Sequence, residues 1–393
     1  MYDFDEVIDR RGTGSSKWDG FEERFPGLDV RGALPMWVAD MDFRCPDEVV
    51  QAVKEKAAQG IYGYPAPRGE AFNNAAAGWL LRRDGWNIDK AWIVETAGVV
   101  PAVTYAVQEF TEEGDGVIIQ TPVYYPFKDR CITYNKRRAV ENPLIEENGY
   151  YSMDFEDLQQ KAADPGTKLM ILCSPHNPVG RVWTRQELAE VSRICRENNV
   201  LLFSDEIHSD LIMPGYTHTT AAQAGGEGNL IAAYAPSKTF NLAGMRTSAI
   251  IIPDEKIRSR FQARIRRNEA GGRNFFGETA LVAAWTYGDS YLQQLAGYIG
   301  RNLEYVRSFA QEKLQGVRIA PTEGTYFAWV DFRGTDLSEK QINKKVCEEA
   351  KIAGDLGGWF GRQGAGFIRL NLACPRSTAE EAMRRLEKVF PKK

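Results

Sequence analysis

Continuous runs of hydrophobic residues recur along the middle of the chain, and each run ends at small or polar residues. The runs are "GVIIQTP" (116–122), "KLMILCSP" (168–175), "VLLFSDE" (200–206), "NLIAAYAPS" (229–237) and "SAIIIP" (248–253). Apolar runs without polar alternation are typical of strands that are covered on both faces. The pattern therefore predicts a buried parallel sheet.

Segments with helical spacing of apolar positions accompany these strands. A helix is predicted over 47–59, after Pro46, and another over 99–110, which begins behind "TAG". The segment "TRQELAEVSRICRENN" lies between the second and third strands and opens with Thr184 and Glu187, which have the spacing of a capping box. It is predicted to be a crossover helix, and the repeated alternation of strand and helix predicts an α/β fold.

The pattern changes after about Gly288. A long helix is predicted over 291–314, followed by the strands "TYFAWVDF" and "GFIRLNLA". The last segment is predicted to be a helix that is capped by Ser377 and Glu380 and runs to Phe390. This order of elements predicts a smaller α+β domain at the C-terminal end.

Three regions follow from these patterns. Residues 46–287 are predicted to form a large domain that carries the sheet, and residues 288–393 a small C-terminal domain. Residues 1–45 lack strong periodicity, and we expect them to pack against the small domain or against a partner subunit.

Composition and charge narrow the class of protein. The 393 residues are 43% hydrophobic and 26% charged, with a net charge of −4, so no basic field favours nucleic acid or an anionic membrane surface. The first residues lack the apolar core of a signal peptide, and no apolar run approaches the length of a membrane helix. The six cysteines form no C-x-x-C pair, and only three histidines are present, so we expect a cytoplasmic protein without a metal site.

Chemically active side chains follow four successive strands. The residues in question are Tyr124 and Tyr125, His176 and Asn177, Asp205 and His208, and Lys238. Ligands of open α/β sheets bind at the carboxyl ends of the strands, so these groups are predicted to share one edge of the sheet.

This set of groups matches the parts of one cofactor. A partly buried Lys238 amine can attack an aldehyde, Asp205 can keep a pyridine nitrogen protonated, and the ring of Tyr124 can stack on a flat heterocycle. Asn177 or His208 can hydrogen-bond a phenolate oxygen. A phosphate can be held by the backbone at the start of a helix and by nearby side chains, here Gly98, Val99, Ser237 and Arg246. An aldehyde, a pyridine, a phenol and a phosphate together describe pyridoxal 5′-phosphate (PLP).

Each of these residues also has a purely structural interpretation. Lys238 can be an ordinary surface lysine, and Asp205 can cap the turn that follows its strand. Tyr124 and Tyr125 can be packing residues, and His208 can be a buried histidine with satisfied hydrogen bonds.

Arg369 lies inside a predicted apolar strand, where an unpaired charge is costly. It therefore requires a partner. A substrate carboxylate and an internal Asp or Glu are both compatible with the sequence.

The chain resembles the fold-type I PLP enzymes of the class I/II aminotransferase superfamily, and within it the cystathionine β-lyase (C–S lyase, cystalysin-like) branch. The resemblance covers Met36 to Pro375 and rests on "MWVADMDF", "YGYPAPRG", "TAGVVPAV", "GDGVIIQTPVYYPF", "CSPHNPVGRVW", "SDEIHSDLIMPGY", "APSKTFNLAGM" and "GFIRLNLACP". It implies a PLP-dependent transferase-like fold. This fold has a large domain with a mostly parallel seven-stranded sheet and a smaller α+β domain.

The resemblance also implies roles for individual residues. Lys238 would bond to the cofactor aldehyde and move the proton on the substrate Cα, and Arg369 would bind the substrate α-carboxylate beside Tyr125. Tyr64, or its neighbour Tyr62, would reach the phosphate of the other subunit in a homodimer. The implied cofactor-binding residues are Gly98, Val99, Tyr124, Asn177, Asp205, His208, Ser237, Lys238, Arg246 and Tyr64.

Two positions depart from the pattern of this branch. Many relatives have Ser or Thr three residues before the lysine, where this chain has Ala235, so one phosphate hydroxyl is missing. Arg246 matches the phosphate-binding arginine of aminotransferases, which cystalysin-like relatives often lack. Arg246 can compensate for Ala235.

Three functions are compatible with these residues. The resemblance favours β-elimination of a sulfur amino acid, which yields a thiol, pyruvate and ammonia. An aminotransferase would use the same PLP residues. A PLP-binding regulatory protein is the third possibility, although intact Lys238, Asp205 and Arg369 argue against an inactive enzyme.

Overall fold

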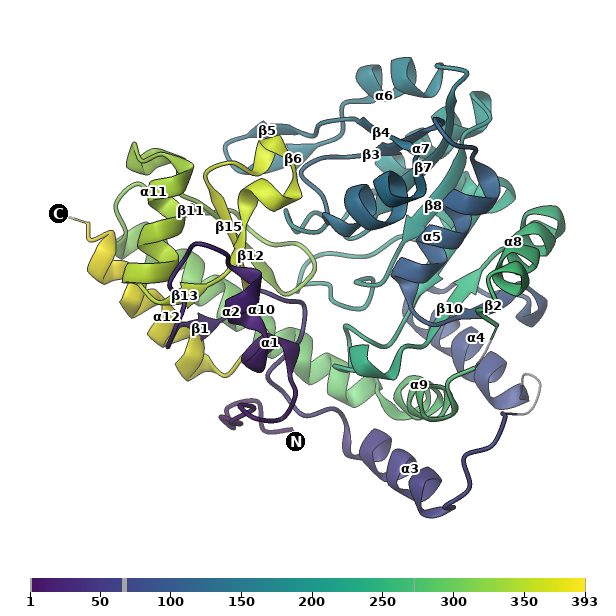
Figure 1. Ribbon diagram of the computed structural model, residues 1–393, viewed down its shortest axis with the longest axis horizontal. Helices are drawn as coiled ribbons and strands as arrows, with labels where there is room; N and C mark the ends of the chain where they lie inside the picture. Colours follow the sequence, from purple (N-terminus) through teal and green to yellow (C-terminus); the bar gives the residue numbers. More distant parts are fainter. Residues whose placement is uncertain (1, 66–68, 272, 393) are drawn as a thin grey trace.

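The computed structural model describes residues 2–65, 69–271 and 273–392. A seven-stranded sheet forms its centre, and all of its strands run parallel except β10, which is antiparallel to both neighbours (Figure 1). In spatial order the strands are β2 (Ile93–Thr96), β10 (Ser248–Ile251), β9 (Leu230–Tyr234), β8 (Leu201–Asp205), β7 (Thr167–Cys173), β3 (Gly116–Ile119) and β4 (Arg138–Glu141). This is the mostly parallel seven-stranded sheet that the family resemblance implied.

Both faces of the sheet are buried, because successive side chains of a strand point to opposite sides. On β8, Leu201 and Phe203 belong to the core that lies against α5 (Val99–Phe110) and α8 (Glu255–Arg267). Leu202 belongs to the core on the other face. The helices that contribute to that second core include α3 (Asp47–Ala58), α4 (Glu70–Asp84), α6 (Phe155–Ala162), α7 (Arg185–Glu197) and α9 (Phe275–Tyr287).

A second, antiparallel sheet is built mainly from the C-terminal part of the chain. Its order is β11 (Arg318–Ile319), β12 (Phe327–Asp331), β15 (Phe367–Asn371) and β14 (Asp355–Leu356). The helices of this part are α10 (Asp289–Lys313), α11 (Glu339–Lys344) and α12 (Arg376–Val389). Helix α10 packs against both α9 and α12 and so connects the two sheets (Figure 1).

The N-terminal segment lies beside the C-terminal elements, with its dark purple ribbon next to the yellow one in Figure 1. It contains the short helices α1 (Ser16–Asp19) and α2 (Phe21–Arg24) and the strand β1 (Leu34–Pro35). Strand β1 pairs in parallel with β13 (Ile352–Ala353). A separate hairpin is formed by β5 (Ile145–Glu147) and β6 (Tyr150–Ser152).

The helix predictions agree with the structure in position and differ at one cap. Helix α5 covers the predicted 99–110, and the capping box of Thr184 and Glu187 is present at the start of α7. The predicted cap at Ser377 is wrong, because α12 begins at Arg376 and Ser377 lies inside its first turn. Pro375 takes the N-cap position there, with a φ of −52°.

No described helix is both long and apolar enough to cross a membrane.

Candidate active site

A cavity of about 410 Å³ opens where β7 and β8 end and α5 begins. This is the position at which open α/β sheets bind ligands. Nine of the residues predicted from the sequence line it: Gly98, Val99, Tyr124, Asn177, Asp205, His208, Ser237, Lys238 and Arg246. The structure thus brings them together, although they come from six separate segments of the chain.

Lys238 enters the cavity from the turn that follows β9. Its Nζ donates a hydrogen bond to the backbone oxygen of Ala39 over 3.1 Å. Burial lowers the pKa of Lys238 to about 8, and Arg369 acts in the same direction, whereas Asp40 and Asp205 oppose the shift. A lysine with this pKa is partly neutral near physiological pH and can act as a nucleophile or a base.

Asp205 is the last residue of β8 and lies on the same face as Phe203, since side chains on a strand alternate. It is buried and accepts a hydrogen bond from the backbone N–H of Ile207 over 3.1 Å. Burial raises the pKa of Asp205 to about 7, while the Ile207 N–H and Lys238 lower it. A cationic nitrogen placed against this carboxylate would be stabilised.

The N-terminus of α5 forms the other end of the cavity. Gly98 is the N-cap residue with a φ of 116°, and no side chain caps the helix there. The first N–H groups of a helix have no intrahelical partner and attract anions. Arg246 is exposed beside them, and no carboxylate of the described residues lies within ion-pair distance of it. Thr247 also lines the cavity, and its buried Oγ1 has no hydrogen-bond partner among the described residues.

Neutral polar and aromatic groups complete the wall. Tyr124 packs at a right angle to Phe127, with 5.5 Å between ring centroids. His208 packs against the adjacent rings of Tyr326 and Phe327, and burial holds its pKa well below the usual value, so the imidazole is neutral. Its Nδ1 has no hydrogen-bond partner among the described residues.

Arg369 does not line the cavity, and it has an internal partner. The side chain is buried on β15 and forms an ion pair with Asp355 on β14. It also donates to the Oδ1 of Asn177 over 2.7 Å and to the backbone oxygen of Trp37 over 3.0 Å. Of the two partners considered from the sequence, the internal carboxylate is therefore present, while Asn177 connects Arg369 to the cavity wall.

Two further predicted residues, Tyr125 and Tyr64, also lie outside the cavity. Tyr125 packs against Phe360, and the guanidinium of Arg24 lies 5.0 Å from the centre of its ring. Tyr64 is fully exposed on the segment after α3, and Tyr62 is exposed nearby.

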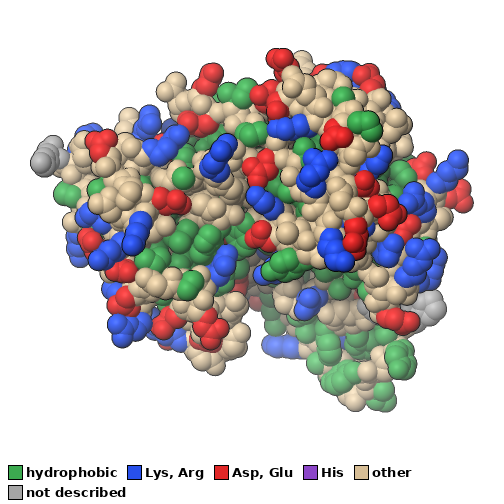
Figure 2. All heavy atoms as spheres, turned by 45° about the horizontal axis from the view of Figure 1, so that its top comes forward, with side chains coloured by type: hydrophobic (Ala, Val, Ile, Leu, Met, Phe, Trp, Pro, Cys, Tyr) green, Lys and Arg blue, Asp and Glu red, His purple; other side chains and the backbone are tan. Residues whose placement is uncertain are grey.

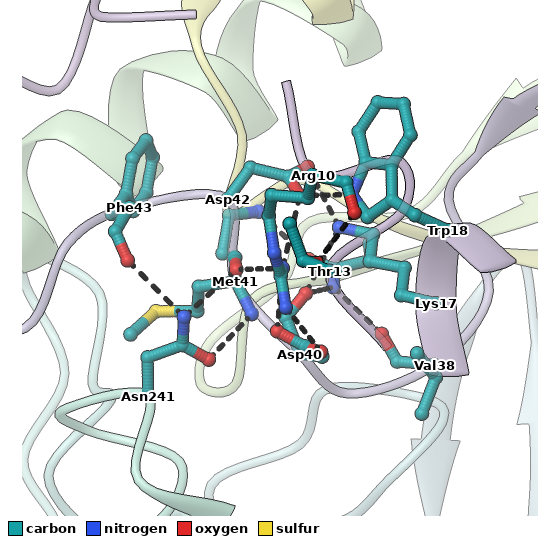
Figure 3. Close-up of polar contacts among 12 residues, drawn as sticks. Arg10, Thr13, Lys17, Trp18, Val38, Asp40, Met41, Asp42, Phe43 and Asn241 are labelled. Carbon is teal, nitrogen blue, oxygen red and sulfur yellow. Dashed lines mark hydrogen bonds and ion pairs between the residues drawn. The ribbon is translucent and has the colours of Figure 1, made fainter. Parts of the chain in front are cut away.

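A polar network that the sequence did not reveal anchors the loop 38–43 (Figure 3). The buried Lys17 donates to Asp42 over 2.7 Å and to the backbone oxygen of Asp40 over 2.9 Å. Arg10 pairs with Asp40 through two bonds of 2.9 Å, and Asn241 binds the backbone of Met41. The loop includes Ala39, which accepts the bond from Lys238. The word "MWVADMDF" marked this loop, but only the fold shows what anchors it.

Comparison with known proteins identifies the family. The model of the family described as aminotransferase class I and II matches residues 35–386. The chain belongs to this family. As a member of the class I and II aminotransferases, it is 42% identical to cystathionine beta-lyase PatB of Bacillus subtilis (strain 168), over 98% of both chains.

Solved structures of the class I and II aminotransferases show the same fold. Cystalysin from Treponema denticola, which contains a PLP cofactor, superposes with a TM-score of 0.93 at 39% identity, covering 99% of this chain and 98% of that one. A PLP-bound protein from Clostridium difficile 630, assigned only provisionally to the aminotransferases, gives a TM-score of 0.95 at 38% identity, covering 99% of this chain and 100% of that one.

Proposed function

We propose that the protein is a PLP-dependent carbon–sulfur lyase, which cleaves a thiol from Cβ of a sulfur amino acid and releases pyruvate and ammonia. The observation that carries the proposal is the meeting of Lys238, Asp205 and the N-terminus of α5 in one cavity. The similarity to a cystathionine β-lyase over nearly the whole chain supports this reaction above the others.

The residues in the cavity fit PLP. The buried Asp205 suits a pyridine nitrogen, and Lys238 suits an aldehyde. The helix N-terminus at Gly98, together with Ser237 and Arg246, suits a phosphate. When bound, PLP supplies an electron-accepting ring that stabilises negative charge at the substrate Cα.

The protein's own groups then position the substrate and move its protons. Lys238 reaches into the cavity and, when neutral, can remove the proton from Cα as a general base. Ala39 accepts a hydrogen bond from the Nζ of Lys238, and Asn241, three residues after the lysine, binds the backbone of Met41 in the same loop as Ala39. Arg369 would bind the α-carboxylate and so fix the position of Cα relative to the Nζ of Lys238.

An aminotransferase is the second candidate, because the matching family model carries that description and the same cavity serves either reaction. The two reactions diverge after proton removal. A lyase expels the thiolate from Cβ, whereas a transaminase returns the proton to the cofactor.

Cystathionine distinguishes the two functions. The purified protein, saturated with PLP, is expected to release pyruvate from cystathionine without any added keto acid, and Lys238→Ala should abolish this release. Amino-group transfer that depends strictly on a keto acid, with no pyruvate formed in its absence, would contradict the lyase and support the aminotransferase.

We also propose that the protein is a cytoplasmic homodimer in which Tyr64 contacts the phosphate of the other subunit. The segment after α3 exposes three large apolar side chains, Ile61, Tyr62 and Tyr64. Hydrophobic side chains gather at the lower right of Figure 2, where α3 projects in Figure 1. Exposed apolar patches of this kind mark interaction sites, and the resemblance names a second copy as the partner.

A further inference from the structure

The ion pair between Arg369 and Asp355 places a carboxylate on the group that is proposed to bind the substrate. The two residues face each other across the antiparallel pair of β14 and β15. Both side chains are almost completely buried, with 2% and 0% exposure, and the Oδ2 of Asp355 accepts from the Nη2 of Arg369. Asp355 thus pairs with the Arg369 guanidinium in the way that a substrate carboxylate would.

This pair is incompletely hydrogen-bonded. The Oδ1 of Asp355 and the Nε of Arg369 are both buried, and neither has a hydrogen-bond partner among the described residues. The Nη1 of Arg369 donates to Asn177 and its Nη2 also donates to Trp37, so three of the five N–H groups of the guanidinium are in use. The guanidinium therefore keeps donor capacity for a second carboxylate while Asp355 is in place.

Three charged or titratable groups act on Asp355. Arg369 on β15 pairs with it, Arg24 on α2 contributes a second positive charge, and Tyr125 lies close enough for Asp355 to raise its pKa. Burial raises the pKa of Asp355 to about 6, although both arginines act to lower it. The Asp355 carboxyl is therefore mostly ionised at neutral pH, which is only about one pH unit above its pKa.

A substrate carboxylate on Arg369 would create two negative charges in one buried site. Two carboxylates in such a site do not both stay ionised, and one of them takes a proton. The substrate carboxylate is intrinsically the stronger acid and keeps its charge against the guanidinium.

We propose that Asp355 is the internal counter-ion of Arg369 and accepts one proton from solvent when the substrate α-carboxylate binds. Before binding, the guanidinium faces the Asp355 carboxylate. Afterwards it faces the substrate carboxylate, while Asp355 is a neutral carboxylic acid. Asp355 acts through Arg369 and is thus a positioning residue. The inference rests on the proposed function, which assigns the substrate carboxylate to Arg369.

The test uses the PLP-loaded protein and 3-(methylsulfanyl)propanoate, which has the carboxylate and sulfur of S-methylcysteine but no amino group. Its inhibition constant is measured from pH 6.5 to 8, and proton uptake is measured by calorimetry in two buffers of different ionisation enthalpy. The inhibition constant of the wild type should rise by up to about tenfold per pH unit, with close to one proton taken up. The visible band of the cofactor, recorded in the same titration, accounts for any proton on the cofactor itself.

Asp355→Asn removes the titrating group and keeps the shape of the side chain. This variant should bind the probe more tightly than the wild type at pH 8 and with little pH dependence. Asp331→Asn is the matched control, since Asp331 lies in the same sheet and pairs with Arg333 outside the site. It should retain the wild-type pH profile.

Three results would overturn the proposal: a pH-independent inhibition constant in the wild type, an Asn variant that binds more weakly at every pH while keeping the wild-type slope, or a probe that fails to compete at pH 6.5. The wild-type profile decides even if the Asn variant does not fold. If the probe binds with proton uptake but the protein releases no pyruvate, the proposed lyase function is wrong and the inference about Asp355 holds. If the protein releases pyruvate but binds the probe without proton uptake, the lyase function holds and the inference about Asp355 is wrong.

Discussion

Arg246 is a charged residue of the cavity that has no ion-pair partner among the described residues. It takes a left-handed backbone conformation, with a φ of 47°, directly after the short helix Ala243–Met245. It is exposed at the edge of the cavity, and no carboxylate of the described residues pairs with it. A charged hydrogen bond to a phosphate would satisfy its guanidinium.

Arg246→Gln is therefore expected to weaken PLP binding by about tenfold or more, since hydrogen bonds to charged groups contribute about 1.5–3 kcal/mol. The measurement is a fluorescence or absorbance titration of the apoprotein with PLP. Arg266→Gln is the control, because Arg266 lines the adjacent cleft but not the cavity. Equal PLP affinity in the wild type and Arg246→Gln would remove Arg246 from the phosphate site.

At the scale of residues, the sequence predicted the groups that follow strands and missed those that act through long-range contacts. Asn177, Asp205 and Lys238 could be placed because each comes just after an apolar run. Asp355 could not, since it stands in a two-residue strand and acquires its role only through Arg369. Thr247 also lines the cavity with a buried hydroxyl, whereas Ala235 supplies none. No pattern in the sequence pointed to Thr247.

Helix α5 depends on one glycine for its position at the cavity. Gly98 combines a φ of 116° with a ψ of 165°, a region that residues with a side chain rarely adopt. A Cβ at this position would meet only Pro101, at 3.7 Å, so the obstacle is backbone strain rather than lack of space.

Gly98→Ala should lower the free energy of unfolding by about 1–3 kcal/mol and also weaken PLP binding, because relief of the strain would turn the N–H groups at the start of α5. Thermal unfolding of the apoprotein and PLP titration would measure the two effects. Gly228→Ala serves as the control, since that glycine has open space around it and no positive φ. If the variant loses stability but keeps its PLP affinity, the N-terminus of α5 does not bind the phosphate.

At the scale of elements, long apolar runs were predicted correctly and short strands were missed. The five runs all became strands of the large sheet. Strand β2 was not predicted, because its four residues include Glu95 and are too short for a period. The antiparallel direction of β10 could not be predicted either, because a strand buried on both faces has the same apolar pattern whichever way it runs.

At the scale of the whole molecule, the exposed apolar segment after α3, with Ile61, Tyr62 and Tyr64, does not line the cavity of the same chain. Tyr64 lies after α3 and outside the cavity, although the proposed function requires it near a phosphate. A second copy of the chain resolves this conflict, since a two-fold axis would give each subunit the other's Tyr64.

Coexpression of Tyr64→Ala with Lys238→Ala tests the exchange. Each variant alone should have little activity, whereas random mixing should restore about a quarter of the wild-type activity, because half of the dimers would contain one intact site. Sedimentation would confirm the dimer. Tyr134→Ala, which removes another exposed tyrosine, should remain active on its own. Absence of complementation, or a fully active monomer, would contradict a shared site.

The anchoring of the loop 38–43 also sets the order in which a nascent chain can complete its site. Residues 34–42 leave the ribosome well before residues 351–353 and 371–373, which are among their backbone partners and include Asn371, bound to the backbone of Val38 and Asp40. At elongation rates of about 5–20 residues per second the gap amounts to roughly tens of seconds, during which the large sheet can already form. Phe25 and Trp37, buried in the finished protein, lack in that interval the part of their cluster that Cys347 and Ala353 supply. A chain released before residue 371 would therefore have Lys238 on the turn that follows β9, but the loop that carries Ala39 would lack the two bonds from Asn371 to the backbone of Val38 and Asp40.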